Sequence, residues 1–175
     1  MEHTGSKLIF RVINTVFLLT FILLGTSHAA IGKTIYMGPS ETYKSLSSAF
    51  TAMSAGDTLI IRDGTYIGTE NQVRYDVKPP SGTTGAYTTI KAENPGKVKF
   101  DGQNSRSMFW GYGTFNMSYV AFDGIQWINS NSGHDLTGSA HNNRTAHHIK
   151  FTRCGFEDNF SIQYSSYILV EDCYV

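Results

Sequence analysis

A short aromatic stretch in the middle of the sequence holds the side chains best suited to contact a sugar. It runs from Met108 to Phe115, with glycines on both sides of Tyr112. Aromatic rings pack against the apolar faces of sugar rings, so an exposed ring here would form a platform for a carbohydrate. The alternative is a core in which aromatic side chains stack on one another. We expect most of the stretch to be core, with Trp110 and Tyr112 as the candidates for exposure and substrate binding.

Three basic residues are candidates for contact with an acidic sugar. Arg144, Lys150 and Arg153 each offer a cation that can neutralise a uronate carboxylate. The same region contains three carboxylates, which are groups that can bind Ca²⁺: Glu157, Glu171 and Asp172. The alternative is ordinary surface charge, in which Arg153 and Asp172 form an exposed ion pair worth less than about 1 kcal/mol.

The segment between residues 128 and 149 is rich in polar side chains. Those that can bind ligands are His134, Asp135, His141, Asn142, Asn143, Arg144, His147 and His148. No spacing among them fixes the tetrahedral geometry of a metal site, so the sequence predicts no metal ligand. We expect a solvent-exposed loop on one side of the fold, where it can contact a sugar.

These candidates lie on or beside a repeated apolar pattern. The pattern reads apolar, any, apolar, any, any, apolar, any, apolar, and it occurs three times. Its apolar positions are filled by Val120, Phe122, Ile125 and Trp127, then Ile149, Phe151, Cys154 and Phe156, then Ile168, Val170, Cys173 and Val175. Pairs of short strands joined by a two-residue bend are typical of the rungs of a solenoid. Because the third copy ends on the last residue, we expect an incomplete solenoid whose exposed apolar rung promotes aggregation.

The two cysteines, Cys154 and Cys173, occupy the same position in successive copies of the pattern. On neighbouring rungs their Cα atoms would lie about 4.8 Å apart, a separation that a disulfide tolerates. The alternative, which packing alone explains, is a stacked pair of buried thiols.

The first 29 residues have the features of a secretory signal peptide. Lys7 and Arg11 precede an apolar run over residues 12–24, and small residues before position 30 allow cleavage after Ala29. A membrane anchor is the alternative, but the run is shorter than the ~20 residues of a spanning helix. We therefore predict a signal peptide at 1–29, one domain over 30–175, and a secreted protein, extracellular or periplasmic, without membrane contact after signal removal.

The domain itself is expected to be mainly β-structure. Leu46, Ala49, Phe50 and Met53 have helical spacing, and this one helix would cover the open end of a stack of strands. Strands are predicted over 56–66, 73–77, 88–92 and 97–100, between glycine and proline turns. Strands this short suit a sandwich, a barrel or a β-helix, and the repeated pattern favours the β-helix. A formal net charge of zero argues against a nucleic-acid partner.

Two stretches of the sequence resemble a known family. Residues Tyr43 to Tyr66 are similar to the opening helix and first coil of secreted right-handed parallel β-helix proteins of the pectate-lyase type. Residues Tyr87 to Gly102 resemble the second coil of polysaccharide lyases related to alginate lyase and chondroitinase B. The resemblance implies an all-β, right-handed parallel β-helix with a short N-terminal capping helix, and an acidic polysaccharide as partner.

The resemblance also implies a reaction. Those lyases remove the proton next to a uronate carboxylate and expel the 4-linked sugar, which requires Ca²⁺ or an arginine at the carboxylate and a lysine or arginine as base. It implies that these groups lie on coils beyond Val175, so it identifies no catalytic residue and no Ca²⁺ ligand here. We expect the N-terminal part of a polysaccharide lyase, inactive by itself.

Two alternatives to a lyase remain. One is a non-catalytic carbohydrate-binding or surface-adhesion solenoid, which needs exposed aromatic rings and no base. The other is a glycoside hydrolase on the same scaffold, which would carry closely spaced aspartates in later coils.

Overall fold

The computed structural model describes residues 32–110, 116–137 and 146–175. The predicted signal peptide at 1–29 lies outside the described residues. So do five of the residues considered for ligand binding, Tyr112, His141, Asn142, Asn143 and Arg144.

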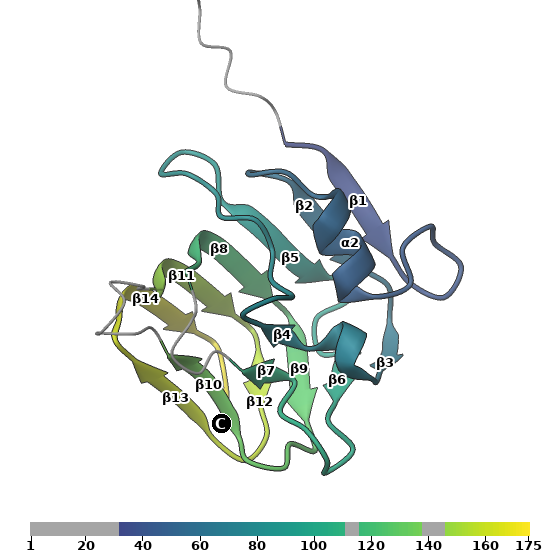
Figure 1. Ribbon diagram of the computed structural model, residues 1–175, viewed down its shortest axis with the longest axis vertical. Coiled ribbons are helices and arrows are strands. Elements are labelled where there is room, and N and C mark those ends of the chain that lie inside the picture. Colours follow the sequence, from purple (N-terminus) through teal and green to yellow (C-terminus); the bar gives the residue numbers. More distant parts are fainter. Residues whose placement is uncertain (1–31, 111–115, 138–145) are drawn as a thin grey trace, which may run out of the picture. The chain divides into compact units, whose positions relative to one another are not determined.

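The described residues form fourteen short strands, one α-helix and one 3₁₀ turn (Figure 1). In chain order the elements are β1 (Thr34–Met37), α2 (Leu46–Ala52), β2 (Thr58–Ile61), β3 (Gly64–Tyr66), η1 (Thr69–Asn71), β4 (Val73–Arg74), β5 (Thr88–Ala92), β6 (Val98–Asp101), β7 (Phe109–Trp110), β8 (Ser118–Asp123), β9 (Ile125–Ile128), β10 (His134–Thr137), β11 (Ala146–Thr152), β12 (Gly155–Phe156), β13 (Phe160–Gln163) and β14 (Ser165–Glu171).

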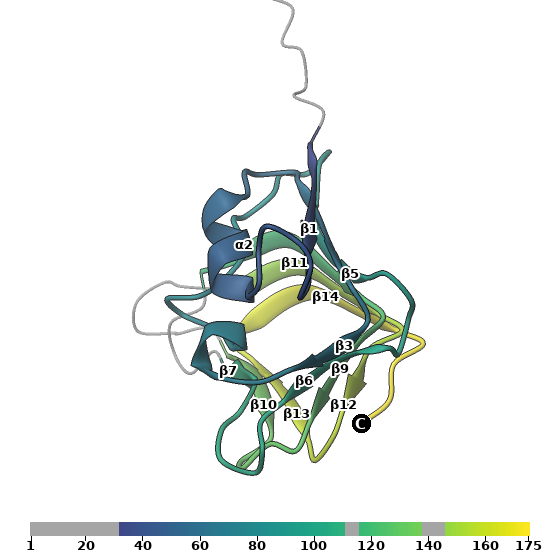
Figure 2. The ribbon, with the colours of Figure 1, turned by 90° about the vertical axis from the view of Figure 1, so that its right-hand side faces the viewer.

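The strands form three parallel sheets, and each turn of the chain adds one strand to each sheet. The orders are β1-β2-β5-β8-β11-β14, β3-β6-β9-β12 and β4-β7-β10-β13. Figure 2 shows the three sheets on three sides of a common interior. Because every third strand returns to the same sheet, successive turns stack as rungs, as the repeated pattern predicts.

The bend between the first two strands of each rung requires a left-handed backbone. Gly124, Arg153 and Asp172 occupy this bend in three successive rungs, with φ of 72°, 54° and 53°. At Gly124 a side chain would also collide with Pro95, because an added Cβ would lie 2.8 Å from its Cα. The bend turns the chain sharply enough for the apolar positions on both of its sides to face the interior.

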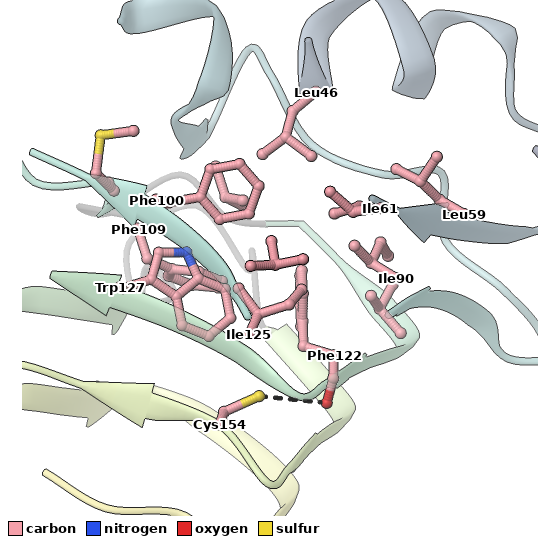
Figure 3. Close-up of a cluster of buried hydrophobic side chains, with 14 of the residues drawn as sticks. Leu46, Leu59, Ile61, Ile90, Phe100, Phe109, Phe122, Ile125, Trp127 and Cys154 are labelled. Carbon is pink, nitrogen blue, oxygen red and sulfur yellow. Dashed lines mark hydrogen bonds between the residues drawn. The ribbon is translucent and has the colours of Figure 1, made fainter. Parts of the chain in front are cut away.

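The interior is filled by aliphatic and aromatic side chains (Figure 3), and some of the aromatic rings stack from rung to rung. Phe122 and Phe151, from β8 and β11, stack with centroids 5.4 Å apart and an interplanar angle of 10°. Trp127 stacks on Phe156 of β12 at 4.8 Å and 8°. Register explains these stacks, since parallel pairing places Phe122 beside Phe151 and Trp127 beside Phe156. The apolar positions of the first two copies of the pattern are all buried.

The third copy of the pattern differs from the first two in burial. Its strand β14 is the last of the six-stranded sheet, and only one neighbour, β11, pairs with it. Val170 continues the row of Phe122 and Phe151 but is 45% exposed.

The predicted helix is present as α2. Ser45 caps it, because its Oγ accepts a hydrogen bond from the backbone N–H of Ser48, and the backbone N–H of Ser45 donates one to the Ser48 Oγ. Leu46, Ala49 and Phe50 are buried. The idea that α2 covers an open end of the stack stays a prediction.

Two of the strand predictions were wrong in detail. The single strand predicted over 56–66 is two strands, β2 and β3, separated at Arg62-Asp63, where the chain passes from one sheet to the next. The strand predicted over 73–77 stops at Arg74, because the backbone of Arg74 and Val77 closes a tight turn by two mutual hydrogen bonds.

The two cysteines are free and lie on neighbouring rungs. The Cys154 thiol is fully buried and contacts the carbonyl oxygen of Phe122 at 3.6 Å (Figure 3). Burial raises the pKa of the Cys154 thiol to about 12. A thiol that stays protonated is a poor nucleophile, so the structure agrees with stacked apolar fillers.

Candidate functional site

Trp110 lines a polar pocket, and it is the candidate that the structure supports best. The pocket has a volume of about 300 Å³. It lies where the turn after η1, the loop from β6 to β7 and the loop from β9 to β10 meet. Its walls are formed by Gln72, Ser105, Arg106, Ser107, Trp110, Asn131 and Ser132.

Strand alternation places Trp110 on the outside of the fold. In β7 Phe109 is buried, whereas Trp110 is 41% exposed. Parallel pairing sets Arg74 of β4 on one side of Trp110 and Asp135 of β10 on the other. Arg74, Trp110 and Asp135 therefore form an outward row across three rungs, beside the pocket.

A hydrogen-bond network fixes the polar wall of the pocket. Ser107 Oγ and Ser132 Oγ are 2.9 Å apart, and Ser130 Oγ donates to the carbonyl oxygen of Gly133 at 2.7 Å. The Gln72 side-chain amide donates to the carbonyl oxygen of Ser107 at 2.7 Å, and that of Asn131 to Ser105 at 3.2 Å. These bonds join three successive turns of the chain, so the wall is held in place before any ligand binds.

Two charged groups at this surface remain available to a ligand. Arg106 donates to the side-chain oxygen of Gln103 at 3.0 Å and forms no ion pair within the part of the chain that the structure describes. Oδ1 of Asp135 is buried without a hydrogen-bond partner among the described residues. Arg74, by contrast, is paired with Asp76 at 2.8 Å.

These groups can make three kinds of contact with a ligand. Trp110 offers an aromatic surface, the Asp135 carboxylate can accept a hydrogen bond from a hydroxyl group, and Arg106 can bind a carboxylate or sulfate. A carboxylate oxygen buried without a partner is costly, and a donor from a ligand would remove that cost.

The other two described candidates lie away from the pocket, Lys150 on β11 and Arg153 in the bend that follows it. Lys150, on the outer face of β11, places its Nζ 4.2 Å from the centroid of the Tyr87 ring. Arg153 binds Asp123 through two hydrogen bonds of 2.9 and 2.6 Å, which raise the pKa of its guanidinium. The predicted ion pair of Arg153 with Asp172 was therefore wrong, because Asp123 on the preceding rung offers both of its oxygens. The structure does not bring Lys150 and Arg153 together with Trp110.

The polar segment before β11 is only partly a loop. His134 and Asp135 belong to strand β10, and the His134 side chain points into the core, where it is 1% exposed. The prediction of an exposed His134 was wrong, because a strand of four residues alternates sides even when its sequence is polar. His147 and His148 lie in β11.

No group of three or more His, Cys, Asp or Glu residues that could hold a metal ion is present in the described ranges 32–110, 116–137 and 146–175. The described carboxylates therefore do not form the multidentate oxygen cage that Ca²⁺ prefers.

Sequence reasoning missed Arg106 and the residues that support it. A signal was present, since the turns after β6 and β9 are both rich in small polar residues, Gln103-Asn104-Ser105 and Asn129-Ser130-Asn131. The two turns stack in the structure, where the backbone N–H of Asn104 donates to the carbonyl oxygen of Asn129.

Three parallel sheets that each gain one strand per turn define a parallel β-helix, and its outer surface carries Trp110 beside a polar pocket. The sequence matches the Chondroitinase B family over residues 40–168, and the chain belongs to that family. Comparisons with curated proteins and with solved structures found no match. Within the described residues, no helix is both long and apolar enough to cross a membrane.

Proposed function

We propose that this chain is part of a secreted protein that binds an acidic polysaccharide at the Trp110 pocket and is related to lyases that cleave uronate-containing glycans by β-elimination. The observation that carries the proposal is the combination of Trp110, Arg106 and Asp135 on a β-helix of the Chondroitinase B family. Among the described residues Arg106 forms no ion pair, and Oδ1 of Asp135 has no hydrogen-bond partner. Arg106 would bind the acidic group, while Trp110 and Asp135 would hold the sugar ring.

A non-catalytic binding protein is the second candidate function. It is favoured by the composition of the pocket, whose lining contains a cation, an aromatic ring, amides and hydroxyls. The carboxylate beside this lining, that of Asp135, is assigned here to binding a hydroxyl group rather than to proton transfer. An absorbance assay for the unsaturated uronate product separates the two functions. Chondroitin, alginate and pectate should each be tested with and without Ca²⁺. Product formation supports a lyase, and binding without product supports the second candidate.

Trp110→Ala is expected to weaken binding of the acidic polysaccharide at least about tenfold, because an aromatic anchor at the centre of a site carries much of the binding energy. Trp110→Phe should retain most of the affinity. Isothermal titration calorimetry with chondroitin, alginate and pectate measures both.

Tyr36→Ala is the matched control. Tyr36 is 39% exposed, much like Trp110, but it lies on β1 in another sheet. Equal losses in Trp110→Ala and Tyr36→Ala, or no loss in either, would contradict the assignment of the pocket.

Export is the remaining element of the proposal. We expect the protein recovered from culture medium or periplasm to begin at Ala30, since cleavage after Ala29 fits the small residues before it. N-terminal sequencing checks this, and an intact Met1 on the exported protein would refute it.

A further inference from the structure

A second cluster of chemically active side chains lies on the outer face of the six-stranded sheet. Tyr119 of β8, His148 of β11 and Tyr167 of β14 occupy equivalent places on three successive rungs. Their rings form a ladder in which His148 stacks on Tyr119 and on Tyr167, each at 4.5 Å between centroids and 17° between planes. A protonated imidazole between two phenol rings gains from the attraction of a cation for an aromatic face.

A shared backbone distortion produces this ladder. Tyr119, His148 and Tyr167 have φ of 54°, 55° and 55°, a left-handed conformation that is uncommon for residues other than glycine. In β11 it leaves both His147 and His148 partly exposed between buried Ala146 and buried Ile149. Strict alternation would have turned one of the two histidines into the core.

The two histidines are hydrogen-bonded to each other. Nδ1 of His147 and Nδ1 of His148 are 2.9 Å apart, so one of these atoms carries a hydrogen and the other accepts it. Neither Nε2 atom has a hydrogen-bond partner among the described residues. If the pair takes up one more proton, both Nε2 atoms become N–H donors and the pair carries one positive charge.

The groups around the pair add positive charge rather than cancel it. Lys150 follows His148 by two residues on the same face, about 7 Å along the strand, and contacts only the Tyr87 ring in the described structure. Tyr87 meets Tyr119 edge-on, and the Tyr119 hydroxyl accepts a hydrogen bond from Thr84. The carboxylates of this face, Asp123 of β8 and Glu171 of β14, flank Thr152 at the far end of the strands, and Asp123 is bound by Arg153.

We propose that Tyr119, His147, His148 and Lys150 form a second binding surface for the carboxylate or sulfate group of an acidic sugar, which binds more tightly when the histidine pair is protonated. The inference rests on the proposed function for the class of ligand but uses a different sheet and different residues. A protonated imidazole donates hydrogen bonds from both ring nitrogens, which is the form that an anion prefers. His134 stays neutral at both pH values of the test described below, because burial lowers its pKa to about 4.

The test compares the binding of chondroitin sulfate and alginate at about pH 6 and about pH 8, at constant ionic strength, by isothermal titration calorimetry. The wild-type protein is expected to bind about tenfold more tightly at the lower pH, since a charge-assisted hydrogen bond contributes on this scale. The double variant H147Q/H148Q should lose this dependence on pH. Lys150→Gln should weaken binding at both pH values and keep the ratio between them.

Lys99→Gln is the control for loss of a lysine charge, since Lys99 is exposed on β6 in another sheet, and it should have no effect. Three results would each overturn the inference. The affinity of the wild-type protein could be independent of pH, or its dependence on pH could persist in H147Q/H148Q. Lys150→Gln and Lys99→Gln could also change the affinity equally. If any of these results is found but Trp110→Ala still weakens binding, the second surface is refuted and the proposed function at the Trp110 pocket stands. If the wild type binds neither glycan at either pH, the proposed function fails together with it.

Discussion

Replacing Trp127 with alanine is expected to lower the free energy of unfolding by about 3–5 kcal/mol, the range for loss of a large aromatic side chain from a packed core. Trp127 is fully buried on β9, where it stacks on Phe100 of the preceding rung (Figure 3) and on Phe156 of the following one. Its removal would leave a cavity that interrupts the stack on both sides. Urea denaturation followed by circular dichroism measures the change.

Trp127→Phe is the matched variant for this prediction. The indole Nε1 of Trp127 is buried without a hydrogen-bond partner among the described residues. Phenylalanine keeps a ring in the stack and removes this unpaired donor, whose burial costs about 1–3 kcal/mol. We therefore expect Trp127→Phe to lose less than about 2 kcal/mol. Equal losses in the two variants would show that ring stacking is not what Trp127 contributes.

Lowering the pH from 6.5 to about 4 is expected to reduce the free energy of unfolding by about 3 kcal/mol through protonation of His134 alone. Burial lowers the pKa of His134 from 6.5 to about 4, and the nearby carboxylate of Asp158 opposes this shift only in part. Within that window the unfolded chain binds a proton that the folded chain does not, so acid favours unfolding. The contribution is complete above pH 6.5 and is lost as the pH falls towards 4.

His134→Leu isolates this effect from the titration of surface carboxylates. Both ring nitrogens of His134 lack hydrogen-bond partners in the described structure, and the ring packs against Phe156. A leucine should therefore leave the protein at least as stable at neutral pH and less sensitive to acid. Urea midpoints measured across the window test this, and parallel curves for wild type and variant would contradict it.

For the outward-facing residues, the sequence predicted exposure to solvent but not the partners of the side chains. Trp110 was a candidate for exposure within a mostly buried aromatic stretch, and it is 41% exposed beside the buried Phe109. Lys150 and Arg153 were also correctly placed on the surface, but their partners were not, since Arg153 binds Asp123 and Lys150 lies over Tyr87. A partner on another rung depends on which strands pair and in which register, and local spacing does not specify this.

The sequence by itself determined the stacking of the rungs. The repeated apolar positions of β8, β9, β11 and β12 can all be buried only if the copies lie side by side in register, so the parallel arrangement and the inward residues follow from the pattern. The glycine at position 124 marks the bend between two sheets in the same way.

Only the tertiary structure decided where ligands can bind. Strands β4 and β7 of the third sheet have two residues each, too few to show a period, yet they place Arg74 beside Trp110. The pocket and the histidine ladder likewise join residues that are about 20 to 60 positions apart in the chain, such as Gln72 with Asn131 and Tyr119 with His148. Contacts between residues so far apart in the sequence depend on the length of each loop before the chain returns to the same sheet. A local sequence pattern does not reveal which residues of successive turns then become neighbours.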